Sequence, residues 1–173
     1  ARRKRELELA RTSKPKRYDD ETGTIWAYVV IDDSVVRITA CESTAKKLVI
    51  PEMMRVLIDT YSYKWEDAWE TVRRTVSYTN HTVMPEALET WNEDLFRLKL
   101  PRIYAIVKEI NERFCRDAWN AFPGNWQRIS KMSIVGYGSV RMANLSVVGS
   151  HSVNGVSKLH SGILTETIFK DFY

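Results

Sequence analysis

The feature that most constrains the fold of this 173-residue chain is a long amphipathic segment that begins at Pro101. Proline is favoured at the first position of a helix, and Phe122-Pro123-Gly124 ends the pattern. Because one face of such a helix is apolar, it needs other elements to pack against, so the sequence predicts a folded body with a core. The apolar residues recur at helical spacing, at Ile103, Ile106, Val107, Ile110, Phe114 and Ala118.

Helical signals recur before and after this segment. Pro51-Glu52 and Pro85-Glu86 read as helix starts, with a carboxylate near the positive end of the helix dipole. The same apolar spacing predicts two more apolar helix faces, the first of them buried. One consists of Trp65, Ala68, Trp69, Val72 and Val76, and the other, on a last helix, of Val153, Val156, Leu159 and Ile163.

Extended structure is predicted at two places. Residues 24–40 are rich in β-branched side chains, and Asp32-Asp33-Ser34 interrupts them, which is typical of a β-hairpin. Gly136-Tyr137-Gly138 predicts a turn between two short extended pieces. Farther on, Gly149 and Gly155 would allow a close approach of the backbone to its neighbours.

The order of these elements predicts the fold class. A β-hairpin followed by helices favours an α+β fold that is mostly helical, or a largely helical part of an α/β domain. We therefore divide the chain into a flexible basic tail (1–20), a β-hairpin segment of unclear origin (21–49) and a helical body (50–173).

The positive charge is concentrated at the N-terminus. Residues 1–17 hold eight Lys or Arg against two Glu, a net charge of +6 in a chain whose total is +4, so the rest carries −2. No aromatic residue that could stack on a base precedes Tyr18. We interpret the segment as a solvated tail, and a nucleic-acid partner is disfavoured.

Composition argues against several classes of protein. The longest apolar run, Ile25 to Ile31, is far shorter than the roughly 20 residues of a membrane span. Two cysteines without a Cys-x-x-Cys motif argue against a disulfide scaffold and favour a cytoplasmic protein. His81, His151 and His160 lack the i, i+4 spacing of a helical metal site, so no metal is expected.

Two long strings carry more information than the composition. One runs Tyr-Thr-Asn-His-Thr-Val-Met-Pro-Glu-Ala-Leu-Glu (78–89), and the other Arg-Met-Ala-Asn-Leu-Ser-Val-Val-Gly-Ser-His-Ser-Val-Asn-Gly-Val (141–156). Both resemble catalytic-face segments of the α-1,4-glucan (glycogen and starch) phosphorylases, of the bacterial type. Supporting strings in the family's order begin at Ile50, Leu100, Glu109 and Ile168.

The resemblance implies which part of a phosphorylase this chain corresponds to and which reaction that enzyme catalyses. Residues 50–173 resemble part of the family's N-terminal domain, and residues 1–49 do not. Phosphorylases cleave the terminal bond of a glucan with inorganic phosphate, release glucose 1-phosphate with retained configuration, and act as homodimers. They use pyridoxal phosphate, whose own phosphate exchanges a proton with the substrate phosphate. The protein stabilises an oxocarbenium-like transition state.

The site residues follow from the matched strings. His81 matches the family's catalytic histidine, whose main-chain carbonyl faces the developing cation while its ring binds the sugar 6-hydroxyl. Thr82 and Ala87 match positions that line the glucosyl pocket, Val156 matches an apolar wall of it, and Asn154 is a further substrate-binding candidate.

Each of these assignments has a structural alternative. His81 could cap the end of the helix that contains Trp65, and Asn154 could cap the last helix. His160 reads as structural. Glu86 and Glu89 resemble a carboxylate pair, but we interpret Glu86 as helix-dipole compensation and Glu89 as solvated, because this chemistry takes its acid from phosphate.

Two interpretations of the whole chain stay open. It is either a fragment of a phosphorylase, or a non-catalytic binding module derived from one. The family's aspartate and histidine before the Ile-Pro-Glu string are missing, since Glu42 to Lys46 stand there. No candidate for the lysine that binds pyridoxal phosphate is visible, so no cofactor is expected on this chain alone, and whether the chain is itself an enzyme is left open.

Overall fold

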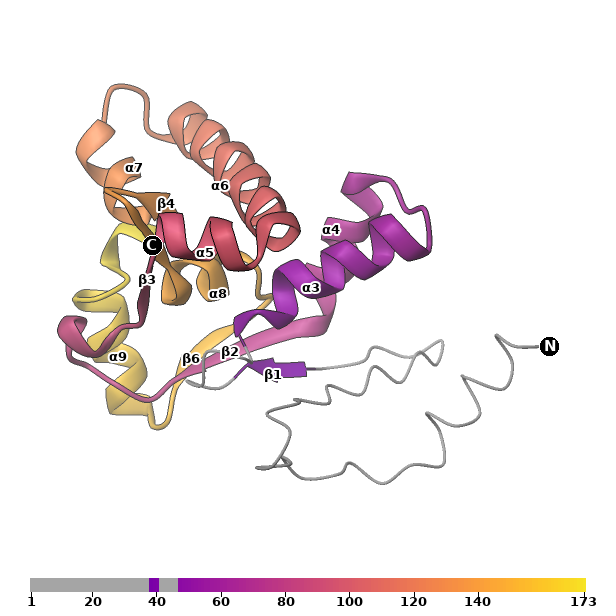
Figure 1. The fold of residues 1–173 in the computed structure, drawn as a ribbon. Helices are drawn as coiled ribbons and strands as arrows, with labels where there is room; N and C mark the ends of the chain where they lie inside the picture. The colour runs from indigo at the N-terminus through magenta and orange to yellow at the C-terminus, as the bar shows by residue number, and fades with distance from the viewer. Residues whose placement is uncertain (1–37, 41–46) are drawn as a thin grey trace, which may run out of the picture.

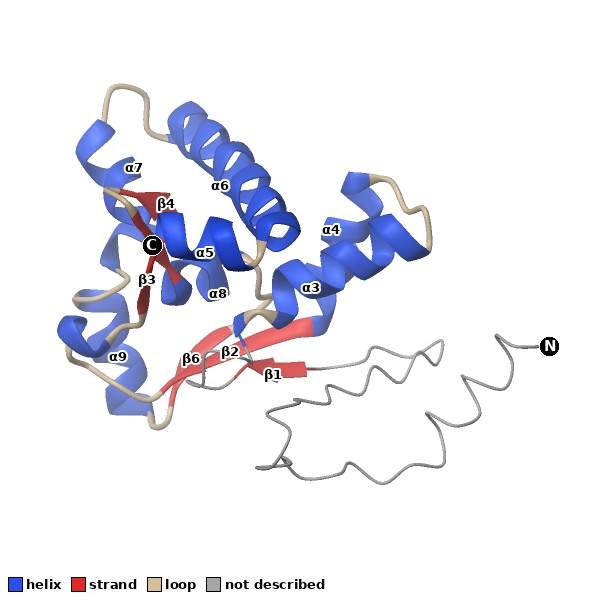
Figure 2. Cartoon of the chain, in the orientation of Figure 1, coloured by secondary structure: helices blue, strands red, loops and turns tan. Residues whose placement is uncertain are grey.

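A computed structural model describes residues 38–40 and 47–173 of the chain. The basic tail and all but the last three residues of the predicted hairpin lie outside this part. The described residues are mostly helical, with a few short strands (Figures 1 and 2). The elements are β1 (Ile38–Ala40), α3 (Val49–Arg55), η1 (Val56–Thr60), α4 (Trp65–Thr75), β2 (Val76–Asn80), η2 (Pro85–Ala87), β3 (Thr90–Asn92), α5 (Glu93–Lys99), α6 (Pro101–Ala121), α7 (Trp126–Met132), β4 (Val135–Gly136), β5 (Ser139–Arg141), α8 (Met142–Val148), β6 (Val153–Gly155), α9 (Lys158–Glu166) and η3 (Lys170–Phe172).

A three-stranded parallel sheet positions the two strings that carry the resemblance. Its strand order is β1-β2-β6, with Ile38 opposite Val76 and Asn80 opposite Gly155. The middle strand, β2, follows α4 directly and alternates buried with half-buried residues, as a strand packed on one face does. Figure 1 shows β2 and β6 running side by side, with α3 and α4 on one side of the sheet.

A small antiparallel sheet lies on the other side of the body. Its order is β3-β5-β4, and the predicted turn at Gly136-Tyr137-Gly138 joins β4 to β5. Tyr137 and Gly138 have φ values of 53° and 69°. Two consecutive left-handed residues give the turn type whose twist matches a two-residue hairpin, which confirms the turn prediction.

The helix that begins at Pro101 is α6, and its apolar face forms part of the core. Proline stands at its first position, as predicted, and the helix ends at Ala121, just before Phe122-Pro123-Gly124. Its buried residues are Ile103, Ile106, Val107, Ile110 and Ala118. Phe114 is only half-buried, because it lies at the edge of the stripe.

Three details of the helix predictions are wrong. Pro51 is the third residue of α3 and not its first. In the Trp65 stripe, Ala68, Val72 and Val76 are buried, whereas Trp65 and Trp69 are half-buried at the margin of the core, and Val76 belongs to β2. The last helix does not include Val153, which lies in β6, because pairing with β2 overrides the local apolar spacing.

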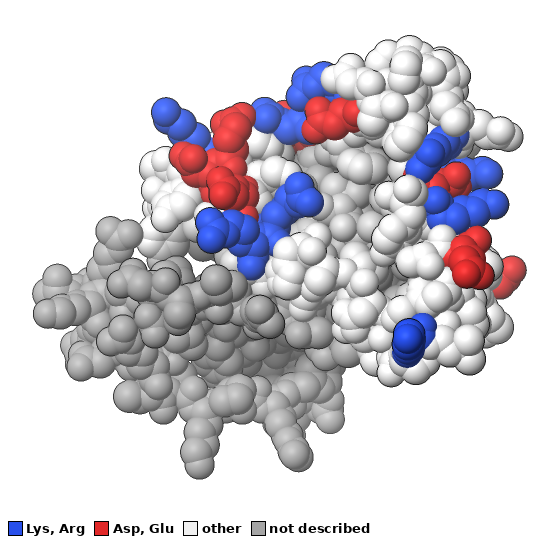
Figure 3. Space-filling view, turned by 180° about the vertical axis from the view of Figure 1, so that it is seen from behind, with Lys and Arg blue, Asp and Glu red and all other residues white. Residues whose placement is uncertain are grey.

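Surface ion pairs join elements that are distant in sequence. Arg102 Nε donates to Asp59 Oδ2 over 2.9 Å and ties α6 to η1, and this hydrogen bond lowers the pKa of the Asp59 carboxyl. Arg113 Nη1 lies 3.0 Å from Glu66 Oε1 and joins α6 to α4. Seen from behind, basic and acidic side chains lie in mixed groups (Figure 3). Because these pairs are exposed, each contributes little to stability.

Gly149 and Gly155 are both points of close approach, as the sequence predicts. A Cβ on Gly149 would lie 2.8 Å from Ile50 Cδ1 and 2.9 Å from Ile50 Cγ2, and Ile50 is fully buried. A Cβ on Gly155 would lie 2.8 Å from His160 Cγ. The first contact joins the end of α8 to α3, so the lack of a side chain at Gly149 sets how closely these helices pack.

We expect Gly149→Ala to lower the free energy of unfolding by about 1–3 kcal/mol, because the added methyl group overpacks the core against Ile50. Chemical denaturation followed by circular dichroism measures this. Gly162→Ala is the matched control: nothing lies within 4 Å of its added Cβ, and alanine favours a helix, so it should not destabilise. Adding Ile50→Val to Gly149→Ala removes Cδ1 and should recover part of the lost stability. If Gly149→Ala and Gly162→Ala destabilise the protein equally, the close packing of Gly149 on Ile50 is contradicted.

Candidate functional site

The site lies where the parallel strands β2 and β6 end. Asn80 and Gly155 are paired across the sheet, so the residues that follow them, His81 and Val156, leave the sheet at the same edge. Loops at the carboxyl ends of parallel strands are where open sheets of this kind bind ligands. Both His81 and Val156 are exposed, Val156 to 59%.

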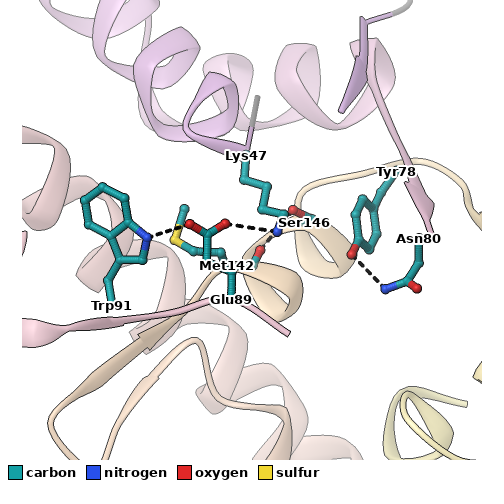
Figure 4. A network of polar contacts seen from close by, with 7 residues as sticks. All are labelled: Lys47, Tyr78, Asn80, Glu89, Trp91, Met142 and Ser146. Atoms are coloured by element: carbon teal, nitrogen blue, oxygen red, sulfur yellow. Dashed lines mark hydrogen bonds and ion pairs between the residues drawn. The ribbon is translucent and has the colours of Figure 1, made fainter. Parts of the chain in front are cut away.

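The backbone of His81 is held by the residue before it. Asn80 is fully buried, and its Oδ1 accepts a hydrogen bond of 2.8 Å from the Thr82 amide. The carboxamide is fixed in turn, because its Nδ2 donates to the Tyr78 hydroxyl over 3.0 Å. Figure 4 shows the Tyr78 ring and the Asn80 amide facing each other. The chain therefore makes a tight, side-chain-bonded turn over His81.

A second contact comes from α9. The buried His160 ring places Nε2 3.3 Å from the Thr82 carbonyl oxygen, so Nε2 is the donor in this contact. The Ser157 hydroxyl accepts from the His160 amide and caps α9, while the Ser161 hydroxyl accepts from the Gly155 amide. The start of α9 is thereby tied both to the end of β6 and to the loop after β2.

Four of the five predicted site residues meet at this edge of the sheet. His81 and Thr82 follow β2, and Asn154 lies in β6, where its Nδ2 donates to the Thr79 hydroxyl over 3.2 Å. Val156 comes two residues after Asn154. The fifth, Ala87, is exposed on η2, at the far end of the loop that begins at Thr82.

Two structural alternatives are wrong. His81 does not cap the helix that contains Trp65, because α4 ends at Thr75 and β2 separates them. Asn154 does not cap the last helix, since Ser157 does. His160 has a contact that sequence reasoning missed, with a residue 78 positions earlier in the chain. No local pattern signals that contact.

Glu89 is not a solvated carboxylate, contrary to our interpretation. Its Oε2 lies 3.1 Å from Nζ of Lys47, whose side chain is only 5% exposed, and its Oε1 accepts from Trp91 Nε1 over 2.8 Å. Figure 4 shows Glu89 between these two partners. The Met142 amide also donates to the Glu89 carbonyl. Glu86 is exposed in the first turn of η2, away from this network.

The described residues offer no buried, unengaged lysine for pyridoxal phosphate. Every lysine in the described ranges except Lys47 is exposed, and Lys47 is engaged by Glu89. An internal aldimine needs a lysine inside a pocket that also holds the cofactor. Within residues 38–40 and 47–173, no three His, Cys, Asp or Glu side chains cluster as a metal site would require. The helices in that same part of the chain are too short or too polar to cross a bilayer.

Comparison with known proteins identifies the family. A sequence profile of the carbohydrate phosphorylases matches residues 33–173, beginning before Ile50, where the resemblance was first placed. The glycogen phosphorylase of Bacillus subtilis (strain 168) is 52% identical over 130 residues, and the muscle form of Ovis aries is 51% identical over 133. Each alignment covers 75% of this chain but only 16% of the relative's length. With a match over most of its length and half of the aligned residues identical, the chain belongs to the carbohydrate phosphorylase family.

Proposed function

We propose that this chain is the part of a glycogen phosphorylase that forms one wall of the glucosyl site. The whole enzyme would release glucose 1-phosphate from an α-1,4-glucan with inorganic phosphate, and would act as a homodimer. The observation that supports this most is the convergence of His81, Thr82, Asn154 and Val156 at one edge of the parallel sheet, from two strings 75 residues apart. The identity to glycogen phosphorylases favours this function over a non-catalytic module.

The chain's own residues would bind and orient the sugar. The exposed His81 would direct its main-chain carbonyl at the ring as positive charge develops, and its imidazole would bind the 6-hydroxyl. A carbonyl held rigid before the reaction stabilises charge without having to reorganise. Thr82 and Ala87 would line the pocket, Val156 would form its apolar wall, and Asn154 would bind a hydroxyl. Bound pyridoxal phosphate would supply the phosphate that exchanges a proton with the substrate, and the residues that hold it would come from outside the described part.

A chimeric enzyme tests the proposal. The aligned segment of this chain would replace its counterpart in the Bacillus subtilis glycogen phosphorylase, with which it shares 52% identity over 130 residues. We expect the chimera to release glucose 1-phosphate from glycogen. A folded chimera that binds pyridoxal phosphate but lacks this activity would refute the assignment.

In the active chimera, we expect His81→Ala to lower kcat/KM by the equivalent of about 1–3 kcal/mol. The substitution keeps the main-chain carbonyl and removes only the ring, which leaves the sugar hydroxyl unpaired. Steady-state kinetics in the phosphorolysis direction measures this. His151→Ala, which removes an exposed histidine outside the proposed site, is the control and should leave kcat/KM unchanged.

We expect the 173-residue chain alone to form no stoichiometric adduct with pyridoxal phosphate and to show no phosphorolysis. The physical reason is that its only buried described lysine is already paired with Glu89. Incubation with the cofactor, borohydride reduction and mass spectrometry of the intact chain give the measurement. One reduced adduct per chain on a single lysine would contradict the expectation.

A further inference from the structure

We propose that Asn80 is a positioning residue, which sets the direction of the His81 main-chain carbonyl. The effect of Asn80 on catalysis rests on the proposed function. The orientation itself follows from contacts within the chain, and it can be measured without substrate.

The argument starts from the peptide unit that joins His81 to Thr82. This unit contains the His81 carbonyl and the Thr82 amide, and it is trans, like the other peptide bonds of the described residues. In a planar trans peptide, the C=O and the N–H point in opposite directions. Whatever fixes the Thr82 N–H therefore fixes the His81 C=O.

Asn80 fixes that N–H. Its Oδ1 accepts from the Thr82 amide over 2.8 Å, so the His81 carbonyl points away from the Asn80 carboxamide. Asn80 is fully buried and His81 is exposed. The His81 carbonyl therefore points away from the buried side of the loop. The same hydrogen bond polarises the peptide and adds negative charge to the carbonyl oxygen.

Two further residues hold Asn80 and the loop that contains Thr82 in place. The Thr82 N–H can only donate and so requires Oδ1 on its side, while the Tyr78 hydroxyl accepts from Asn80 Nδ2 over 3.0 Å and holds the other end of the carboxamide. On the other side, His160 Nε2 donates to the Thr82 carbonyl and anchors the next peptide to α9. The His81–Thr82 peptide is thus flanked by anchors on β2 and on α9.

The first experiment uses the chain itself. Amide hydrogen exchange, followed by NMR, is compared in the parent chain, Asn80→Ala and Asn80→Asp. We expect Asn80→Ala to speed exchange of the Thr82 amide about three- to tenfold, the equivalent of one lost hydrogen bond. Asn80→Asp keeps an acceptor for the Thr82 amide, and the Tyr78 hydroxyl can donate to its second carboxyl oxygen, so it should retain protection even though burying a carboxyl group lowers stability. Tyr78→Phe, which keeps the ring and removes the hydroxyl that holds Asn80 Nδ2, should speed exchange to a smaller degree.

Asn144→Ala is the matched control. Asn144 is also a buried asparagine, but its amide donates to the carbonyls of residues 131–133 at the end of α7. Its loss should lower stability and leave the relative protection of the Thr82 amide unchanged. Unchanged Thr82 exchange in both Asn80→Ala and Tyr78→Phe would overturn the proposal.

The second experiment uses the active chimera. We expect Asn80→Ala to lower kcat about 10- to 100-fold with little change in KM, because a carbonyl turned away from the sugar loses an interaction made in the transition state. Asn80→Asp should restore most of kcat, and Asn144→Ala should keep it. A fall in kcat no larger than that of Asn144→Ala would overturn the catalytic role. An inactive parent chimera would instead refute the proposed function, and the exchange experiment would still decide the orientation.

Discussion

Replacing Ile110 with alanine is expected to lower the free energy of unfolding by about 2–5 kcal/mol. Ile110 lies in the middle of α6 with 2% of its surface exposed, inside the main core cluster. The truncation removes three buried carbons, and the surrounding helices can close the cavity only in part. Urea denaturation gives the measurement, from the shift of the midpoint at constant slope.

Lys108→Ala is the control on the same helix. Lys108 is exposed and lies 3.9 Å from Glu112 in a surface ion pair, so its removal should change stability by no more than about 0.5 kcal/mol. If Ile110→Ala and Lys108→Ala shift the midpoint equally, Ile110 is not a core residue.

Replacing Glu89 with glutamine is expected to cost about 3 kcal/mol, the lower end of the range for breaking a buried ion pair. The reason is that Lys47, with a 5% exposed side chain, would keep a charge without its counter-ion. The value lies at the lower end because 24% of the Glu89 side chain is exposed and water can partly compensate. Glutamine has one oxygen, so it can accept from Trp91 or from Lys47 but not from both, and the change removes one hydrogen bond together with the charge.

A double-mutant cycle separates the energy of the Lys47–Glu89 ion pair from the effects of each substitution on packing. Lys47→Met/Glu89→Gln leaves no unpaired charge at the site and should be more stable than Glu89→Gln alone. Thermal unfolding of the four proteins gives the coupling energy. Additive effects of the two substitutions would show that the ion pair contributes nothing.

The sequence was informative where structure depends on neighbours along the chain. α6 could be predicted because a proline start, an apolar stripe and a Pro-Gly stop agree with one another. The Gly136–Gly138 turn could be predicted because glycine adopts a positive φ without steric cost, as Gly138 does at 69°, although Tyr137 also has a positive φ of 53°. The two close-approach glycines were predicted for a similar reason, since they sit among small residues.

Predictions failed where the conformation or burial of a residue depends on a partner that is distant in the sequence. The spacing of Val153 and Val156 is helical, yet Val153 pairs in β6 with Tyr78, and Val156 is exposed. Glu89 looked solvated because its partner Lys47 lies 42 positions away. Within the candidate site, the family strings identified His81 and Thr82, but the contacts from Asn80 and His160 become visible only when β2, β6 and α9 are assembled.

The parallel pairing of β2 with β6 also has a consequence for synthesis on the ribosome. β2 cannot complete its hydrogen bonds until β6 emerges, some 75 residues later, and pairing over such a separation is slow. During that interval the nascent chain presents an unpaired strand edge, which can join to another chain. The hydrogen bonds of α6 lie within the helix, so α6 can form meanwhile. A nascent chain from which α6 has emerged but β6 has not would therefore carry a helix beside an open strand edge, a state that favours aggregation.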